Sequence, residues 1–302
     1  HFELPLESKN PFIMRANIDR LAALIEREGV QVIHARSRAP AWSAWYAAQR
    51  TGAHFLTTFH GTYSHGNAIK RRYNSIMTRG ERVIAISQFI AGHIHQVYGV
   101  PTARIRVIPR GVDVARFDPD IVTPERVVGQ AEKWRLPDGQ PVVMLPGRLT
   151  RWKGQTVFID AIGRLAGENI QCLIVGDDQG RTDYRRELES EIEARGLAGR
   201  IHVIEHCDDM PAAYLLTDVV VSASTEPEAF GRIVAEAQSL GRPVIATDHG
   251  GARETVIPDK TGWLVPPNDS QALADTILEV LRQSPGDRAA LAERSMAHIR
   301  EN

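Results

Sequence analysis

Two carboxylates flank a predicted helix start in the stretch EPEAFGRIVAE, residues 226–236. Glu228 lies in the turn that follows an extended run, and the helix is expected to begin near Glu228 to Phe230. Glu236 lies about two helical turns further along. A helix start directs free backbone N–H groups, here those near Phe230 and Gly231, toward an anion. A carboxylate within the helix can accept hydrogen bonds from vicinal hydroxyl groups such as those of ribose. The pattern fits a sugar-nucleotide site, but on this stretch alone a first-turn acid and a solvated helix charge are the slightly favoured explanation.

A second polar stretch, PGRLTRWKG at residues 146–154, follows a predicted apolar strand and leads into a helix. It carries two cations, Arg148 and Lys153, and two glycines, Gly147 and Gly154, that allow close approach of backbone. Cations at such a turn suit a diphosphate ligand. On this segment alone, solvated surface charge explains Arg148 and Lys153 equally well.

Polar side chains also follow the predicted strands of the first half. His60 ends one strand, a position where histidine is usually structural. Ser87 follows another and either contacts phosphate or acceptor or caps the next helix. In HARSRAPAW, the side chains of Arg36, Arg38 and Trp42 either line an acceptor site or cap and pack the turn, and packing is slightly favoured.

The elements that must position these residues alternate along the chain. Short runs rich in valine and isoleucine alternate with amphipathic stretches from residue 30 onward, which is typical of βαβ units on a parallel sheet. A proline-bearing stretch interrupts this alternation, which then starts again. We predict an N-terminal domain at 1–120 that lacks its first strand, a linker at 121–140 and a C-terminal domain at 141–302. Ligands of such doubly wound α/β domains bind at the carboxyl ends of the strands.

Composition narrows the functional classes. The chain has 36 basic and 37 acidic residues, a balance that does not favour nucleic-acid binding. No apolar run approaches membrane-spanning length and the first residues do not resemble a signal peptide, so we expect a cytoplasmic protein. Cys172 and Cys207 lie in apolar, strand-like contexts and are expected to be buried thiols, with neither a disulfide nor a metal site.

The sequence resembles the retaining glycosyltransferases of family four, or glycosyl transferases group 1. That family has the GT-B architecture, in which two Rossmann-like domains face each other across a cleft. The resemblance covers most of residues 32–270, in the family's order. It is carried by FHGTYS, VIAISQFIAGHI, IRVIPRGVDVARFDP, PGRLTRWKG, CLIVGDD, VVVSASTEPEAFGRIVAEAQSLGRPVIATDHGGARETV and TGWLVPPND.

The resemblance implies a role for each polar residue of the second half. Arg148 and Lys153 fall on the pair that binds the donor diphosphate, in place of a divalent metal. Glu228 falls on the first glutamate of a two-glutamate motif and lies against the donor sugar, and Glu236 falls on the ribose ligand. The implied donor-binding residues are Arg148, Lys153, Glu228, Phe230, Gly231 and Glu236.

In the first half, the resemblance places His60 near the donor sugar, so the implied catalytic residues are Glu228, His60, Arg148 and Lys153. Two departures stand out. Arg110 occupies a position where the family usually has asparagine, and the family's Gly-Gly loop after the first strand has no counterpart. A fragment with impaired catalysis would show both the resemblance and this gap.

The implied reaction moves a sugar from a UDP- or GDP-linked donor to a hydroxyl of a saccharide or glycolipid acceptor, with retained configuration and no cofactor or metal. By resemblance, its setting is polysaccharide, glycolipid or lipopolysaccharide assembly in the cytoplasm, including the inner face of the membrane. Whether Glu228 forms a covalent adduct or the acceptor attacks from the departing side stays open, and the resemblance favours the latter.

Three alternatives remain. A sugar-nucleotide-binding fragment would bind the donor without transfer. A nucleotide-sugar epimerase can share the architecture, but the two-glutamate motif argues against it. A nicotinamide dehydrogenase is disfavoured because no Gly-x-Gly-x-x-Gly follows a strand.

Overall fold

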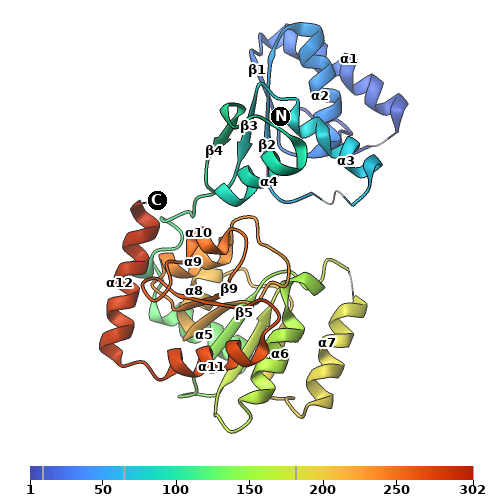
Figure 1. The fold of residues 1–302 in the computed structure, drawn as a ribbon. Coiled ribbons are helices and arrows are strands. Elements are labelled where there is room, and N and C mark those ends of the chain that lie inside the picture. Colours follow the sequence, from blue (N-terminus) through green and yellow to red (C-terminus); the bar gives the residue numbers. More distant parts are fainter. Residues whose placement is uncertain (9, 64–65, 181, 302) are drawn as a thin grey trace. The chain divides into compact units, whose positions relative to one another are not determined.

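The computed structural model describes residues 1–8, 10–63, 66–180 and 182–301. The chain divides into two α/β units, His1–Arg110 and Gly111–Asn302 (Figure 1). Each unit has its own parallel sheet, which confirms the predicted fold class.

The sheet of the first unit has four parallel strands that lie side by side in chain order. They are β1 (Val32–Ala35), β2 (His54–Phe59), β3 (Arg82–Ala85) and β4 (Ile105–Val107). The helical elements are α1 (Pro11–Glu28), α2 (Arg38–Thr51), α3 (Ala68–Asn74), α4 (Gln88–Tyr98) and the short 3₁₀ turns η1 (Ser75–Thr78) and η2 (Thr102–Arg104). Helix α1 packs on α2 through Ala22, Ile25 and Ala47.

The sheet of the second unit has six parallel strands in the order β10-β9-β8-β5-β6-β7. The strands are β5 (Val142–Pro146), β6 (Gln171–Val175), β7 (Ile201–Ile204), β8 (Val219–Ser222), β9 (Val244–Thr247) and β10 (Trp263–Val265). From β5 the chain proceeds to one side through β6 and β7, then returns to pair β8 against the other side of β5. The direction reverses between β5 and β8, and ligands of open α/β sheets bind at the carboxyl ends of strands at such a reversal.

Alternate residues of each strand enter two separate cores, because successive side chains of a strand point to opposite faces. Val143 and Leu145 pack with α6 (Gln155–Arg164), α7 (Thr182–Ala194) and α11 (Ser270–Leu281). Val142 and Met144 pack with α5 (Pro124–Trp134), α8 (Met210–Leu216) and α9 (Arg232–Ser239). The helices on both faces make this unit doubly wound (Figure 1). The remaining helical elements are η3 (Pro119–Ile121), η4 (Arg151–Lys153), α10 (Ala252–Thr255) and α12 (Pro285–Glu301).

The segment expected to be a linker, residues 121–140, contains α5, which packs on α8 of the second unit. Prolines in and just before this segment look like chain breaks in the sequence. In the structure, Pro119 and Pro124 are the first residues of η3 and α5, where a proline costs no hydrogen bond. Phe117 and Trp134 are buried in the second unit's core. The compact units therefore divide at Arg110, ahead of this segment.

Both cysteines are free and buried, as expected. Burial raises the pKa of Cys172 to about 12, which leaves this thiol uncharged and unreactive at neutral pH.

Candidate active site

The loop after β5 is hydrogen-bonded to the end of the neighbouring strand β6 and to the residues that follow it. The backbone N–H of Gly147 donates to the carbonyl of Val175 (2.8 Å), and that of Leu149 donates to the carbonyl of Asp177 (3.1 Å). The side chain of buried Gln155, the first residue of α6, donates to the carbonyl of Arg148 (3.0 Å). The backbone at Arg148 is thus held from both sides while its side chain is exposed.

The same loop is in direct contact with the segment after β8. The backbone N–H of Thr225 donates to the carbonyl of Trp152 (2.7 Å). Gly154 has φ of 73°, and a Cβ atom at this position would lie 1.8 Å from the carbonyl oxygen of Ala223. Only glycine fits here, since both the left-handed backbone and the close approach exclude a side chain. The loops after β5 and β8, on either side of the reversal point, are therefore in close backbone contact.

Lys153 and Glu228 form an ion pair at this junction. Their side chains are only 13% and 12% exposed. The Ser224 hydroxyl donates to the same carboxylate oxygen, Oε1 of Glu228 (2.6 Å), and the Lys153 ammonium lies 4.5 Å from the centre of the Trp152 ring. The structure thus brings together Lys153 and Glu228, and it adds Ser224 and Trp152, which the sequence analysis did not single out.

The segment around Phe230 and Gly231 leads into α9, but the helix starts later than expected. The sequence placed its start near Glu228 to Phe230, whereas α9 begins at Arg232. The reason is Gly231, whose φ of 86° lies in the left-handed region and outside the helix. Gly231 has no side chain to cap this helix start, so the first N–H groups of α9 receive no capping hydrogen bond from it.

Glu236 lies one turn into α9 and is only 9% exposed. Its Oε2 accepts a hydrogen bond from the hydroxyl of Tyr214 (3.0 Å), and its Oε1 lies 3.0 Å from Nε of Arg232. Burial raises the pKa of the Glu236 carboxyl, although both partners favour its charged form. Burial and the adjacent carboxylate also raise the pKa of Tyr214 well above its ordinary value. Tyr214 was missed in the sequence, where its only signal is a single aromatic residue in the otherwise aliphatic helix MPAAYLL.

In the first unit, His60 lies between two arginines. Its Nδ1 is 3.0 Å from a guanidinium nitrogen of Arg110, and its Nε2 is 3.4 Å from Nε of Arg36. Burial, followed by the charges of Arg110 and Arg36 and by His34, lowers the pKa of His60 to about 4. The imidazole is therefore neutral at pH 7. Arg36, His60 and Arg110 follow β1, β2 and β4, so all three lie at the carboxyl edge of the first sheet.

The other residues singled out in the first half make structural contacts. Ser87 is fully buried and caps α4, accepting from the N–H of Ile90 (3.1 Å). The Trp42 ring lies 6.3 Å from the Tyr73 ring. Arg38 lies 4.6 Å from the centre of the Tyr63 ring. These contacts correspond to the capping and packing alternatives.

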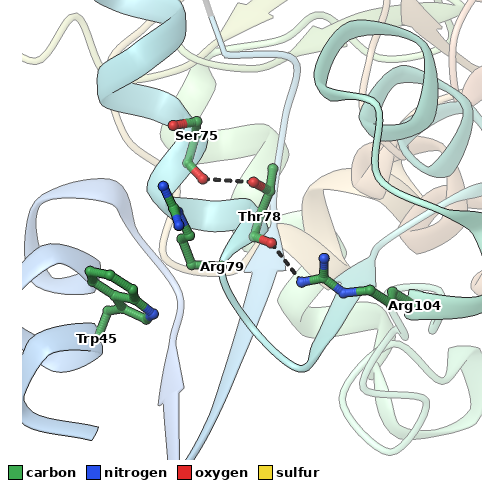
Figure 2. A pocket seen from close by; sticks show the side chains of 5 residues that line it. All are labelled: Trp45, Ser75, Thr78, Arg79 and Arg104. Atoms are coloured by element: carbon green, nitrogen blue, oxygen red, sulfur yellow. Dashed lines mark hydrogen bonds between the residues drawn. The ribbon is translucent and has the colours of Figure 1, made fainter. Parts of the chain in front are cut away.

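A polar pocket of about 460 Å³ lies at the opposite, amino edge of the first sheet (Figure 2). Arg104, just before β4, donates to the carbonyls of Thr78 (2.8 Å) and Gly80 (2.5 Å), and Arg79 lies 5.2 Å from the centre of the Trp45 ring. Both cations are thus engaged in holding η1 and α2 in place. None of the residues assigned a role from the sequence lines this pocket.

Two features are absent from the residues that the structure describes. None of their helices is long and apolar enough to cross a bilayer. Among the same residues, His, Cys, Asp and Glu side chains form no group of three or more that could hold a metal ion.

Comparison with known proteins places the chain in a family. The family described as Glycosyl transferases group 1 matches residues 130–297, and that described as Glycosyltransferase Family 4 matches residues 1–116. A Xylanimonas cellulosilytica protein named D-inositol 3-phosphate glycosyltransferase is 31% identical over 89% of this chain and 67% of its own length. The chain spans between about half and two thirds of the length of such curated relatives.

Two solved structures support the same assignment. A glycosyltransferase from Rickettsia africae superimposes with a TM-score of 0.92 and 37% identity, over 100% of this chain and 80% of that one. Anabaena HepE in complex with UDP-glucose gives a TM-score of 0.85 and 26% identity, over 94% of this chain and 77% of that one. With its two parallel-sheet units and these matches, the chain has the GT-B fold and belongs to the family-four glycosyltransferases, within glycosyl transferases group 1.

Proposed function

We propose that this chain transfers a sugar from a nucleotide diphosphate donor to an acceptor hydroxyl with retention of anomeric configuration. The observation that carries the proposal is the junction of Lys153 and Glu228 at the reversal point of the second sheet. A cation and a carboxylate meet there from two loops in close contact, and the uncapped start of α9 follows Glu228 by four residues. The HepE complex with UDP-glucose supports a UDP-linked donor, and a GDP-linked one is the alternative.

The donor would bind with its diphosphate near Arg148, Lys153 and the start of α9, and its ribose on Glu236. As the glycosidic bond breaks, negative charge grows on the departing diphosphate. Cations and N–H groups fixed beforehand stabilise that charge more in the transition state than in the ground state. This role needs no divalent metal, and we propose that none is used.

Glu228 is suited to position the donor sugar. The ammonium of Lys153 and the hydroxyl of Ser224 both contact Oε1. Among the described residues, the side-chain contacts of Glu228 involve Oε1, so Oε2 can accept a hydrogen bond from a sugar hydroxyl. A carboxylate held in this way supports attack of the acceptor from the departing side more than a covalent adduct. His60 is neutral at pH 7, so it can accept one hydrogen bond and donate another but cannot act as a cationic acid.

The acceptor in this proposal is a saccharide or a glycolipid, and the setting is polysaccharide, glycolipid or lipopolysaccharide assembly. We place the protein in the cytoplasm, with peripheral attachment at the inner face of the membrane. Residues 1–110 contain 15 basic and six acidic side chains, which favours attraction to an anionic surface.

The test is calorimetric titration of UDP, GDP and ADP into the chain without divalent metal, repeated with Lys153→Ala. Lys133→Ala, a lysine on the exposed side of α5, serves as the matched control. Binding of one nucleotide that is lost in Lys153→Ala and kept in Lys133→Ala supports the donor site. Equal binding by both variants would refute it. Donor binding without transfer to any acceptor would identify a sugar-nucleotide-binding fragment, and interconversion of the donor sugar would identify an epimerase.

A further inference from the structure

The loop after β9, residues 248–251, lies directly against the turn that carries Glu228. The backbone N–H of Gly251 donates to the carbonyl of Glu228 (2.8 Å). A Cβ atom on Gly250 would lie 2.5 Å from the same carbonyl oxygen, so the two backbones are in close contact. Strands β8 and β9 are parallel neighbours, and both loops leave from the carboxyl edge of the sheet. A third loop therefore borders the junction of Lys153 and Glu228.

His249, in this loop, contacts the backbone of Ser224. Its Nε2 lies 2.9 Å from the carbonyl oxygen of Ser224 and 3.0 Å from Oγ1 of Thr247. The Thr247 hydroxyl donates to the same carbonyl (2.8 Å), and both Ser224 and Thr247 are buried. The hydroxyl of Ser224 in turn donates to Oε1 of Glu228 (2.6 Å). A continuous set of hydrogen bonds thus connects His249 to Glu228 through Ser224.

These contacts determine where the ring proton of His249 lies. A carbonyl oxygen only accepts, and the single proton of the Thr247 hydroxyl is already donated to it. Nε2 must therefore carry a proton and donate it to Ser224. Burial lowers the pKa of His249, so the ring is neutral at pH 7 and its Nδ1 carries no proton. Protonation of Nδ1 at lower pH would leave the Nε2–H donor in place, so the contact does not depend on the charge of the ring.

The direction of the Glu228 carboxylate depends on the groups that contact its Oε1. These are the ammonium of Lys153 and the hydroxyl of Ser224. A serine hydroxyl can occupy several rotamers, so it directs a carboxylate only where its own backbone is fixed. Two donors on the carbonyl of Ser224 provide that support, and a functional side chain is held precisely only when its supporting groups are held in turn.

We propose that His249 is a positioning residue for the donor sugar. By donating to the carbonyl of Ser224, it holds the Ser224 hydroxyl against Glu228 and so directs the carboxylate toward the sugar. The role of Glu228 toward the sugar rests on the proposed function, whereas the connection from His249 to Glu228 rests on the geometry of the second unit. The experiments below test these two parts separately.

Two substitutions of His249 differ in reach. A glutamine places its amide N–H groups about as far along the side chain as Nε2, whereas an asparagine ends near the position of Nδ1. We therefore expect His249→Gln to keep the contact with Ser224 and His249→Asn to lose it. His202→Asn is the matched control in the same unit. His202 is half-buried too, but its Nε2 contacts Gln171 (2.9 Å), the first residue of β6, at the amino edge of the sheet.

The connection is tested in the ligand-free chain by NMR of the carboxyl carbon of Glu228, assigned by the loss of its resonance in Glu228→Gln. We expect the resonance to shift in Ser224→Ala and in His249→Asn. It should stay near its wild-type position in His249→Gln and in His202→Asn. In Ser224→Ala, the addition of His249→Asn should cause little further change, because the connection runs through Ser224. A resonance that does not move in His249→Asn would overturn the proposal, as would equal shifts in His249→Asn and His249→Gln.

The consequence for the donor is measured by calorimetry with free nucleotides and their sugar conjugates, namely UDP with UDP-glucose and GDP with GDP-mannose. Because Glu228 acts on the sugar in the proposed function, His249→Asn should weaken binding of the sugar conjugate by about fivefold or more, which is typical for loss of one hydrogen bond. Binding of the free nucleotide should be unchanged, and His249→Gln should bind both ligands as the wild type does. A merely structural role would weaken both ligands equally, and that result would overturn the proposal.

Failure of the proposed function would be recognised independently. If the wild type binds none of these ligands, the proposed function is refuted, and the resonance of Glu228 still decides whether His249 acts on it. If the wild type binds a sugar conjugate and His249→Asn binds it equally well, the proposed function stands and the role of His249 is refuted.

Discussion

Lys153 and Glu228, 75 residues apart in the chain, form a largely buried ion pair that joins the loops after β5 and β8. Removal of one partner leaves the other charge without compensation in a poorly solvated place. We predict that Lys153→Met and Glu228→Gln each lower the free energy of unfolding by about 2–4 kcal/mol. The double variant should recover part of this loss. Urea denaturation of the four proteins measures the coupling, and strictly additive losses would contradict a direct interaction.

Substitutions of Lys153 and Glu228 should differ in their effects on nucleotide binding and on turnover. Glu228→Gln keeps the size and polarity of the side chain and leaves Lys153 available for the diphosphate. We expect this variant to retain nucleotide binding within about tenfold and to lose most of its turnover. Calorimetry and single-turnover transfer assays measure the two quantities. Loss of nucleotide binding equal to that of Lys153→Ala would show that Glu228 acts on the nucleotide and not on the sugar.

Substitution of Gly154 tests whether the contact between the loops after β5 and β8 shapes the donor site. A methyl group at Gly154 would lie 1.8 Å from the carbonyl oxygen of Ala223, so the loop must move. We predict that Gly154→Ala destabilises the chain by about 2–4 kcal/mol and abolishes nucleotide binding. Gly167→Ala is the matched control, because a Cβ there meets no atom within 4 Å. Thermal unfolding and calorimetry measure both effects, and wild-type nucleotide binding in Gly154→Ala would contradict the prediction.

The strand pattern was sufficient to predict two doubly wound units, because buried parallel strands such as VVMLP and VVVS are apolar on both faces. Helix α5 was not predicted, since the prolines that begin η3 and α5 look the same in a sequence as prolines that break a chain. The boundary between the units depends on which core buries Phe117 and Trp134, and this is a property of packing.

Motif spacing was sufficient to place four site residues after strands or in the next helix, namely Arg148, Lys153, Glu228 and Glu236. Ser224 and Tyr214 could not be predicted in this way. Ser224 contacts Glu228 only because the turn after β8 folds back on itself, and Tyr214 reaches Glu236 across the packing of α8 and α9. Arg110 was noticed as a departure from the family, but its partner, His60, lies 50 residues away.

Tyr214 is expected to hold Glu236 in its charged form. Its hydrogen bond opposes the effect of burial, so Tyr214→Phe should raise the pKa of Glu236 further. Ribose hydroxyls donate to the carboxylate, and UDP affinity should therefore fall as the pH falls, with a higher midpoint in Tyr214→Phe. Binding of 2′,3′-dideoxy-UDP, which lacks both ribose hydroxyls, should be weaker in the wild type and nearly unaffected by the substitution. An equal effect on UDP and its dideoxy analogue would indicate a purely structural role for Tyr214.

The depressed pKa of His60 predicts a pH dependence of stability. Its pKa is about 4 in the folded chain and near the ordinary histidine value of 6.5 in the unfolded chain, so between these pH values the unfolded chain binds more protons. Stability should therefore be fully present above pH 6.5 and be lost as the pH falls toward 4. His60→Gln keeps a neutral hydrogen-bonding side chain and removes this titration. We expect the wild type to lose more unfolding free energy than His60→Gln between pH 7 and pH 5, as measured by urea denaturation. Parallel pH profiles for the two proteins would mean that His60 protonates as readily in the folded chain as in the unfolded one, and that Arg36 and Arg110 exert no net field on its ring.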